Sequence, residues 1–358
     1  MRAACIYENG DLECIRVDDL EEPQPADNEV VVEVRAAALN HLDIWVRRGR
    51  PGHELHFPHI LGSDATGVVV EKGSAVDMTR IGDEVVINPG LSCNMCEFCR
   101  RGEHSECLHF GLVGLNRPGA FAERIAVPER NVFPKPGRLS YEEAAALPLA
   151  HLTAWRMLVS RAQMRPGETV LIHGVGGGVA LAALQLTKLF GGVAIVTSSS
   201  DDKLDRARDM GADFTINYVK QPGVDVEVKD LTHGRGVDIA LDTTGGATWP
   251  INFGAVRRGG RIVHCGVTTG AEATVNISAL YWNHITVMGS TMGSDEDFRQ
   301  LLKASESAEL RPVIDVILPL EHALEATSRM EEGRQFGKIV LVPGGKARTE
   351  EDEIGAVT

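Results

Sequence analysis

Four of the seven cysteines of this 358-residue chain lie within one stretch of fifteen residues, CNMCEFCRRGEHSEC. Cys93, Cys96, Cys99 and Cys107 follow the spacing C-x2-C-x2-C-x7-C. Four thiolates can surround a Zn²⁺ ion tetrahedrally, and such a site leaves no ligand position for water or substrate. Free or disulfide-bonded cysteines are the alternative. The spacing therefore predicts a structural zinc in a lobe that spans residues 90–110.

A second chemical motif is the glycine-rich turn HGVGGGVALAAL at residues 173–184. It lies between a strand pattern, ETVLIHG, and a helical pattern, and it fits G-x-x-G-x-x-A through Gly174, Gly177 and Ala180. In this context the backbone turns closely around a pyrophosphate, whose charge is met by the N–H groups that start the helix. An ordinary structural turn is the alternative. We predict that the turn binds a dinucleotide through Gly176, Gly177, Gly178 and Val179.

The next strand pattern indicates which dinucleotide is bound. An NAD site usually ends this strand with Asp or Glu, which binds the adenosine ribose. Here the strand ends in VAIVTSSSDDK, so that Ser198 and Ser199 stand at its tip. Small hydroxyls leave room for a 2′-phosphate and Lys203 could supply a counter-charge, whereas Asp201 and Asp202 are expected to cap the following helix. We predict NADPH rather than NADH. The alternative is that the serines only form a turn.

The elements that position these motifs differ along the chain. Up to about residue 135, short apolar runs such as GVVVEKG alternate with Gly and Pro, as in an irregular β-rich domain. From about residue 150, strands alternate with helix-length segments, which predicts a doubly wound α/β fold with a parallel sheet. We assign residues 1–150 and 289–345 to the β-rich catalytic domain, 151–288 to the dinucleotide-binding domain and 346–358 to a frayed polar tail.

Composition limits the partners of the protein. The chain is 43% hydrophobic and 24% charged, as in ordinary globular proteins, and its net charge is −14. This acidic excess, which moderate salt adaptation also produces, argues against a nucleic acid or an anionic membrane as partner. No transmembrane segment or signal peptide is evident, and clustered cysteines in such a chain favour metal over disulfides. We therefore expect a cytoplasmic protein that acts on a small molecule.

The chain resembles the medium-chain dehydrogenase/reductase superfamily over nearly its whole length, to about residue 343. The resemblance is carried by the cysteine lobe and by the segments ALNHLDIW, PHILGSDATGVVVEKG, RIGDEVVINPG, GVGGGVALAALQLTKLFG and FGKIVLVP. It implies a Rossmann-type doubly wound sheet, a chaperonin-10-like (GroES-like) catalytic domain and one structural zinc. It also implies a homodimer or homotetramer, because the strand ITVMGST pairs across a subunit interface in relatives.

The chain departs from this family at the motifs that hold a catalytic zinc in its alcohol dehydrogenases. The family pattern C-H-T-D is replaced by Asn40-His41-Leu42-Asp43, and L-G-H-E by Leu61-Gly62-Ser63-Asp64. The third ligand position falls at about Leu149. Asn, Ser and Leu cannot reproduce a thiolate and imidazole set, so we predict that the lobe zinc is the only one. The alternative is a substitute metal site formed by His41, His59, Asp64 and His151.

The loss of the catalytic zinc ligands indicates the kind of reaction. Without a Lewis acid, oxidation of an alcohol loses its usual means of ionising the alcohol. Hydride addition to a quinone or an α,β-unsaturated carbonyl is easier, because the incoming charge spreads onto an oxygen that hydrogen-bond donors can hold. Asn40 and Asp43 match the N-x-x-D of the zinc-free quinone oxidoreductases and enone or enoyl reductases of the family.

Roles for the three catalytic candidates follow from this match. The resemblance places Asn40 near the nicotinamide or its ribose, and Asp43 is expected to shape the pocket or to orient the cofactor and substrate. His41 is our candidate for a proton or hydrogen-bond donor. The alternatives are that Asn40 only forms a turn and that the proton comes from water.

Further cofactor contacts are implied by the same resemblance. They are Thr153 in the helix near residue 150, Tyr218 after the strand FTIN, Thr243 and Thr244 after VDIALD, and Gly266 and Val267 after RIVHC. Lys338, in the segment FGK, either reaches the cofactor or is a surface charge.

We predict an NADPH-dependent oxidoreductase that transfers hydride to a quinone or an α,β-unsaturated carbonyl compound. One alternative is an NAD(P)-dependent zinc alcohol dehydrogenase with an atypical metal site. The other is a dinucleotide-binding protein without turnover.

Overall fold

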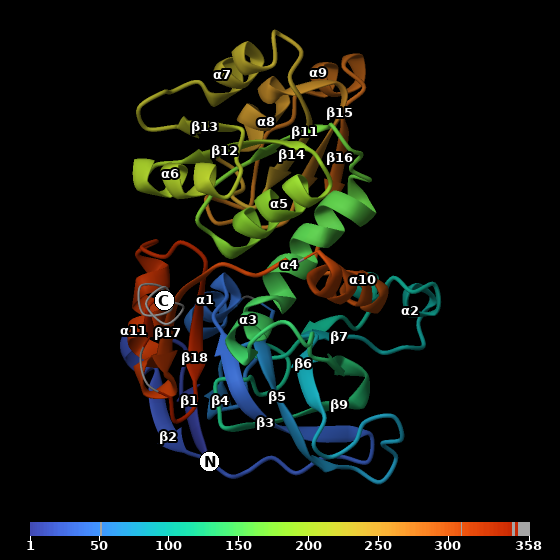
Figure 1. Ribbon diagram of the computed structural model, residues 1–358, viewed down its shortest axis with the longest axis vertical. Helices are drawn as coiled ribbons and strands as arrows, with labels where there is room; N and C mark the ends of the chain where they lie inside the picture. The colour runs from blue at the N-terminus through green and yellow to red at the C-terminus, as the bar shows by residue number, and fades with distance from the viewer. Residues whose placement is uncertain (51, 309, 346–347, 350–358) are drawn as a thin grey trace. The chain divides into compact units, whose positions relative to one another are not determined.

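The computed structural model describes residues 1–50, 52–308, 310–345 and 348–349. The chain forms two compact units (Figure 1), of which the first comprises Met1–Ala150 with Gly293–Thr358 and the second His151–Met292. The chain returns to the first unit at Gly293, just beyond residue 289, where the sequence analysis placed this return. Within the described residues, no helix has the length and apolar character needed to cross a bilayer.

The first unit is built around a sheet with the strand order β10-β6-β5-β3-β18-β17-β19, and β9 also pairs with β3. The central strand β3 is antiparallel to its neighbours β5 and β18, whereas β17 and β18 are parallel. The end of β3 therefore meets the starts of β5 and β18 at one edge of the sheet. The strands are β3 (Glu29–Ala38), β5 (Asp64–Lys72), β6 (Glu84–Ile87), β9 (Arg124–Pro128), β10 (Val132–Pro134), β17 (Ile314–Pro319), β18 (Lys338–Val342) and β19 (Arg348–Thr349).

Smaller elements complete the described part of the first unit. β2 (Arg16–Asp19), β1 (Arg2–Ile6) and β4 (His59–Ile60) form one sheet, and β7 (Gly90–Leu91) pairs with β8 (Gly111–Leu112) at the base of the cysteine lobe. The helices are α1 (His41–Arg48), α2 (Glu97–Arg100), α3 (Tyr141–Ala146), α10 (Asp295–Ser307) and α11 (Ala323–Glu331). Short 3₁₀ turns occur at Leu12–Cys14, His104–Glu106, Glu129–Asn131 and Leu320–His322. Small alanine side chains on α3 and β3 let this helix lie close against the large sheet.

The predicted polar tail, residues 346–358, lies mostly outside the described residues. Its described part, Arg348–Thr349, forms β19 and pairs antiparallel with β17. This pairing differs from the frayed end that we expected, because the open edge of β17 offers backbone groups that a following segment can bind.

The second unit is a parallel sheet with the order β13-β12-β11-β14-β15-β16, which confirms the predicted doubly wound α/β fold. Every residue of VDIALD in β14 is buried, as expected for a central parallel strand. The strands are β11 (Thr169–Ile172), β12 (Val193–Ser198), β13 (Phe214–Asn217), β14 (Val237–Asp242), β15 (Val256–His264) and β16 (Thr286–Gly289). The helices are α5 (Gly178–Leu189), α6 (Asp201–Asp209), α7 (Val224–Leu231), α8 (Trp249–Ala255) and α9 (Ile277–Trp282). α4 (Pro148–Trp155) crosses the sequence boundary of the units and continues as the π-helical segment Arg156–Arg161.

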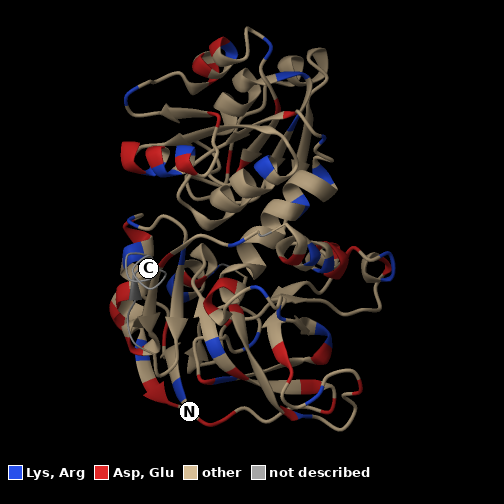
Figure 2. Ribbon diagram, in the orientation of Figure 1, with Lys and Arg blue, Asp and Glu red and all other residues tan. Residues whose placement is uncertain are grey.

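Charged residues are distributed over both units. Acidic and basic residues are interspersed, and α6 carries both signs along its length (Figure 2).

Candidate functional site

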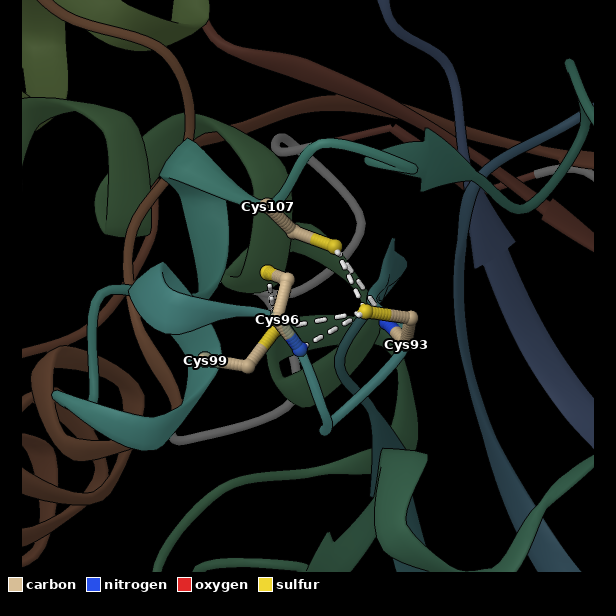
Figure 3. A group of neighbouring side chains, drawn as sticks. All are labelled: Cys93, Cys96, Cys99 and Cys107. Carbon is tan, nitrogen blue, oxygen red and sulfur yellow. Dashed lines mark hydrogen bonds between the residues drawn. The ribbon is translucent and has the colours of Figure 1, made fainter.

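The four cysteines of the lobe point toward one another (Figure 3). The Sγ atoms of Cys96 and Cys99 are 3.5 Å apart, and those of Cys93 and Cys107 are also 3.5 Å apart. Cys93 and Cys99 are 4.0 Å apart, and all four sulfurs lie within 4.8 Å of one another. Four sulfurs bound to zinc at about 2.3 Å would stand about 3.8 Å apart. The cluster therefore fits a tetrahedral zinc ion.

Backbone N–H groups around the lobe favour thiolates. Those of Cys93 and His109 donate to Sγ of Cys107, each at 3.3 Å, and that of Cys96 donates to Sγ of Cys93 at 3.4 Å. Backbone hydrogen bonds lower the pKa of Cys96 to about 6, whereas burial raises that of Cys99 to about 11. A zinc ion would supply the positive charge that a buried Cys99 thiolate needs. With four sulfur ligands the ion has no open position, so its role is structural.

A second polar cluster lies in the first unit at the sheet edge where β3 ends and β5 and β18 begin. Asn40 follows β3, Asp64 is the first residue of β5 and Lys338 is the first residue of β18. The residue before Lys338 is Gly337, which has φ +118°. A glycine is required at this position, because a Cβ would lie 2.5 Å from the carbonyl oxygen of Val313. We call Asn40, Asp64 and Lys338 the Lys338 centre.

The three side chains of the Lys338 centre are joined by short hydrogen bonds. Nζ of Lys338 donates to Oδ1 of Asn40 at 2.6 Å and to Oδ2 of Asp64 at 3.0 Å. Nδ2 of Asn40 donates to the same Asp64 oxygen at 2.9 Å. Lys338 is 3% exposed and Asp64 is 0% exposed. The interpretation of Lys338 as a surface charge is therefore wrong, because β18 is an inner strand of the sheet.

The positions that would carry a catalytic zinc make other contacts. Ser63 donates its hydroxyl to the carbonyl oxygen of Val113 at 2.8 Å, and Leu149 offers its backbone N–H to Oδ1 of Asp64 at 2.9 Å. Asn40 accepts from an ammonium, and a metal cation beside that ammonium would be repelled. This set of donors does not fit a catalytic zinc.

The alternative metal site of His41, His59, Asp64 and His151 is not assembled either. Nε2 of His59 lies 2.9 Å from the carbonyl oxygen of Gly114, and Nε2 of His151, in the second unit, lies 3.1 Å from Oε1 of Gln185. In the part of the chain that the structure describes, the lobe cysteines are the one group of three or more His, Cys, Asp or Glu placed to hold a metal. The predicted substitute metal site is therefore not formed by the described residues, because His59 and His151 each contact another group.

His41 and Asp43 lie in the first turn of α1, next to the Lys338 centre. Oδ2 of Asp43 accepts the backbone N–H of Asn40 at 2.8 Å. Burial raises the pKa of Asp43 to about 7, although the Asn40 N–H and the charge of Lys338 act in the opposite direction. His41 is exposed as a whole, but partial desolvation of its ring and the nearby charge of Arg48 lower the pKa of its imidazole.

In the second unit, the glycine-rich turn joins β11 to α5. Gly176 has φ +117°, Gly177 is the N-cap of α5, and Gly178 and Val179 form its first turn. A Cβ on Gly176 would lie 2.9 Å from Cδ of Lys203, so the Lys203 side chain lies beside the turn. An anion at the start of α5 would meet both backbone N–H groups and an ammonium, which is the arrangement that a phosphate binds.

The tip of β12 lies beside this turn, because β12 pairs parallel with β11. Ser198 is buried and its Oγ accepts the backbone N–H of Ser200 at 3.3 Å, whereas Ser199 is exposed. Tyr218 follows the neighbouring strand β13 and is also exposed. These residues come together at the carboxyl edge of the sheet, where open α/β sheets bind ligands.

The N-cap of α6 differs from our expectation. Ser200 is the N-cap, and its Oγ accepts the backbone N–H of Lys203 at 3.4 Å. Asp201 and Asp202, the predicted caps, lie in the first turn, and Asp201 binds Nδ2 of Asn217 at 2.7 Å and pairs with Lys220. The prediction was off by one residue because serine and aspartate are both good caps.

The loops after β14 and β15 contact each other at the same edge of the sheet. Hydroxyls of the second loop donate to backbone carbonyls of the first, Thr268 to Thr243 at 3.3 Å and Thr269 to Thr244 at 3.0 Å. Gly266 has φ +129°, which suits its close approach to the first loop, and Val267 is exposed. Thr153, also a predicted cofactor contact, is buried in α4 and donates to Sδ of Met292 at 3.8 Å.

Asp242 is a residue that the sequence analysis missed. It ends β14, is buried, and accepts the backbone N–H groups of Thr244 at 2.7 Å and Gly245 at 3.3 Å, so it shapes the first loop. Burial opposes its ionisation, but the imidazole of His264, with Nδ1 at 3.7 Å, and the hydrogen bonds from Thr248 and Thr244 lower the pKa of Asp242. An aspartate at the carboxyl end of a fully buried strand was the available signal.

Comparison with known proteins identifies the family to which the chain belongs. Residues 26–137 match the alcohol dehydrogenase GroES-like domain, and residues 178–307 match the zinc-binding dehydrogenase family. The chain is 30% identical to an NAD-dependent alcohol dehydrogenase of Sulfurisphaera tokodaii, over 96% of this chain and 100% of that relative. The chain belongs to the medium-chain dehydrogenase/reductase superfamily.

Solved structures of members of this superfamily share the fold. A crystal structure of an NAD-dependent alcohol dehydrogenase has a TM-score of 0.91 and 45% identity, over 96% of this chain and 99% of that one. A cobalt- and zinc-bound thermostable alcohol dehydrogenase from Pyrobaculum aerophilum has a TM-score of 0.87 and 34% identity, over the same shares. The protein is therefore an NAD(P)-dependent oxidoreductase with a GroES-like domain and a Rossmann-type sheet, as predicted.

Proposed function

We propose that the protein reduces quinones or α,β-unsaturated carbonyl compounds with NADPH and without a catalytic metal. The observation that carries this proposal is the ammonium of Lys338, hydrogen-bonded to Asn40 and Asp64 at the motifs that hold zinc in the family's alcohol dehydrogenases. At such a centre the ammonium leaves no place for the metal ion that would ionise an alcohol. A conjugated acceptor needs only donors that hold negative charge on its oxygen.

Each of the two units contributes its own residues to this reaction. Bound NADPH would supply the hydride, and the acceptor would take up that hydride and one proton as NADPH becomes NADP⁺. In the second unit, the glycine-rich turn and the loops after β14 and β15 bind and orient the cofactor. In the first unit, Asp43 fixes the start of α1, and Asn40 positions Lys338 and Asp64 through its side-chain amide. The imidazole of His41 donates a hydrogen bond to the acceptor.

The preference for NADPH rests on the tip of β12. Ser198 and Ser199 leave room for a 2′-phosphate, and Lys203 beside the glycine-rich turn supplies positive charge for it. Several relatives are named NAD-dependent, which speaks for NADH instead. The cofactor proposal is therefore tested separately from the choice of acceptor.

The second candidate function is NAD(P)-dependent alcohol oxidation. The names of the relatives favour it, since many are called alcohol dehydrogenases. Alcohol oxidation requires a metal or another Lewis acid at the Lys338 centre. The buried ammonium of Lys338 would repel a metal cation there. The third alternative, a dinucleotide-binding protein without turnover, is not proposed, because the chain belongs to a superfamily of oxidoreductases.

We also propose a homodimer or homotetramer. β16 is the edge strand of the second sheet, and nearby α9 exposes large apolar side chains, with Tyr281 62% and Trp282 66% exposed. An open edge beside exposed aromatic residues is stabilised when a second copy extends the sheet.

The decisive test of function compares the two reactions in one preparation. We expect the purified protein to oxidise NADPH when 1,4-benzoquinone or a simple enone is added, and to do so without added zinc. Alcohol-dependent reduction of NAD⁺ or NADP⁺ should be weak. Fast alcohol oxidation with no reduction of quinones or enones would replace the proposal by the second candidate.

A further inference from the structure

Polar side chains form a row across the parallel sheet of the second unit. The register of β12, β11 and β14 carries Thr197, His173 and Asp242 to the same level, and β15 adds His264 next to Asp242. Each of these residues lies at the carboxyl end of its strand. The row therefore runs directly beneath the tip of β12, the glycine-rich turn and the loops after β14 and β15, which are the segments proposed to bind the cofactor.

Asn252 of α8 joins the middle of this row. Its Nδ2 donates to Oδ2 of Asp242 at 2.5 Å, and its Oδ1 lies 2.8 Å from Nε2 of His173. Nδ1 of His173 lies 3.4 Å from Oγ1 of Thr197, and the same hydroxyl accepts the backbone N–H of Gly174 at 3.3 Å. All four side chains are buried. We call Thr197, His173, Asn252 and Asp242 the Asp242 relay.

The carboxylate of Asp242 fixes the direction of each hydrogen bond in the relay. A carboxylate only accepts, so Asn252 turns its amide nitrogen toward Asp242 and its carbonyl oxygen toward His173. That oxygen needs a donor, which places the ring proton of His173 on Nε2. Burial lowers the pKa of His173 and so favours a neutral ring, whose Nδ1 accepts from the Thr197 hydroxyl. The donors therefore point in one direction, from Thr197 to Asp242.

The two ends of the Asp242 relay support different parts of the proposed cofactor site. At one end, Thr197 holds the backbone of Gly174 in the glycine-rich turn, which is suited to a pyrophosphate. At the other end, Oδ1 of Asp242 accepts the backbone N–H groups of Thr244 and Gly245 in the loop after β14. With the adenosine at the tip of β12 and the pyrophosphate at the turn, the nicotinamide end falls to the loops after β14 and β15.

We propose that Asp242 is a positioning residue that acts through this relay on the glycine-rich turn, so that both ends of the dinucleotide site are shaped together. Hydrogen bonds in a chain polarise one another. The carboxylate thus strengthens Thr197 as the acceptor of the Gly174 N–H, although Asp242 itself lies under another loop. No bond breaks and no proton is transferred. The inference goes beyond the proposed function, because it concerns binding of the dinucleotide and holds for any acceptor.

The test uses a ligand that reaches one end of the site. 5′-ADP carries the adenosine and both phosphates but no nicotinamide, so its dissociation constant, measured by calorimetric titration, reports on the glycine-rich turn. Asp242→Asn replaces the carboxylate by an amide whose N–H groups oppose the Asn252 donor. Asn252→Leu breaks the middle of the relay and leaves the loop contacts of Asp242 in place. Asp238→Asn is the matched control, because Asp238 is a buried carboxylate of the same strand that pairs with Arg235 and Arg257 instead.

Both relay variants should weaken the binding of 5′-ADP. We expect Asp242→Asn and Asn252→Leu each to raise its dissociation constant about threefold to tenfold, the contribution of one ordinary hydrogen bond. The double variant should bind 5′-ADP as the single variants do, because all of them break one chain, whereas independent effects would multiply. Asp238→Asn should leave the affinity unchanged. Near-UV circular dichroism selects folded variants, and Asn252→Leu, which removes no charge, carries the test if Asp242→Asn does not fold.

The ring proton of His173 gives a second readout. Long-range ¹H–¹⁵N NMR spectra distinguish the two ring tautomers, and the His173 signals are assigned by their absence in His173→Gln. The wild type should carry the proton on Nε2, and Asp242→Asn should move it toward Nδ1, because the new amide donates to Asn252 and reverses the relay. An unchanged affinity for 5′-ADP in both single variants, losses that multiply in the double variant, or a wild-type ring protonated on Nδ1 would each overturn the proposal.

Discussion

Nζ of Lys338 lies 3.0 Å from Oδ2 of Asp64, although the two residues are 274 positions apart in the chain. The pair forms because β3 holds β5 and β18 on either side and brings their first residues to one edge of the sheet. A buried ion pair adds little net stability, since desolvation offsets the attraction between the charges. Removal of one partner would instead leave the other charge buried and unpaired, which is strongly destabilising.

The stability of the Lys338 centre can be tested by removing one charge or both. Lys338→Met should lower the free energy of unfolding by about 3–5 kcal/mol, because it leaves the Asp64 carboxylate buried and unpaired. Adding Asp64→Asn should recover most of that loss, since the two amides can then pair without a charge. Urea unfolding at pH 7 measures both. Equal losses in the single and double variants would show that Asp64 does not depend on Lys338.

The lobe zinc is predicted to stabilise the fold without taking part in catalysis. Cys96→Ser removes one of four ligands, so the purified variant should contain no zinc. Loss of the ion should lower Tm, by about 2–4 °C for each 1 kcal/mol of stability lost in a domain of this size. Elemental analysis and calorimetry check this, with Cys14→Ser, outside the lobe, as control. Zinc-free protein that stays folded but has no turnover would contradict a structural role.

Asp43 should make the protein less stable as pH rises. Its pKa is about 7 in the folded protein against an ordinary value of 3.8, so between these values the folded state holds a proton that the unfolded state has lost. The free energy of unfolding therefore falls as pH rises from about 4 to about 7, by about 4 kcal/mol from this group, and levels off above.

The variant Asp43→Asn isolates this contribution, because the amide oxygen can still accept the Asn40 N–H. The neighbouring charges Lys338 and Asp64 remain in place in the variant. Relative to wild type, Asp43→Asn should gain stability between pH 5 and pH 8 in urea unfolding. Asp77→Asn, at an exposed carboxyl, should show no such gain. A difference between wild type and Asp43→Asn that is constant with pH would contradict the raised pKa.

Ser198→Asp should shift the cofactor preference toward NADH. The new carboxylate would accept hydrogen bonds from the ribose of NADH and repel the 2′-phosphate of NADPH. We expect the ratio of kcat/KM for NADPH to that for NADH to fall at least about tenfold, equivalent to about 1.4 kcal/mol. Ser307→Asp, on α10 in the other unit, adds the same charge as a control. An unchanged ratio would remove the basis for the NADPH proposal.

Trp282→Glu should weaken self-association. Trp282 is exposed on α9 beside the open edge β16, and a charge there would be buried without a partner in an oligomer. Analytical ultracentrifugation should show a dimer or tetramer for the wild type and monomer for the variant. Val219→Glu, at an exposed residue next to β13 on the opposite edge, is the control. A wild type that is already monomeric would refute the oligomer.

The sequence predicted the features that depend on local pattern. The parallel sheet, the glycine-rich turn and the four clustered cysteines each follow from spacing along a short stretch. Lys338 could not be placed in this way, because its burial depends on pairing between β18 and β3, which are far apart in the chain. The same limit applies to Asp64, which the sequence analysis considered only as a substitute metal ligand.

The central claim is that the chain holds one structural zinc and uses no catalytic metal. The direct measurement is the zinc content per chain after the protein has been dialysed first against excess Zn²⁺ and then against metal-free buffer. The account predicts about one zinc per chain, held by the four lobe cysteines. About two zinc ions per chain, with the second lost in Asp64→Asn, would contradict it and would make the protein a zinc alcohol dehydrogenase with a rebuilt site.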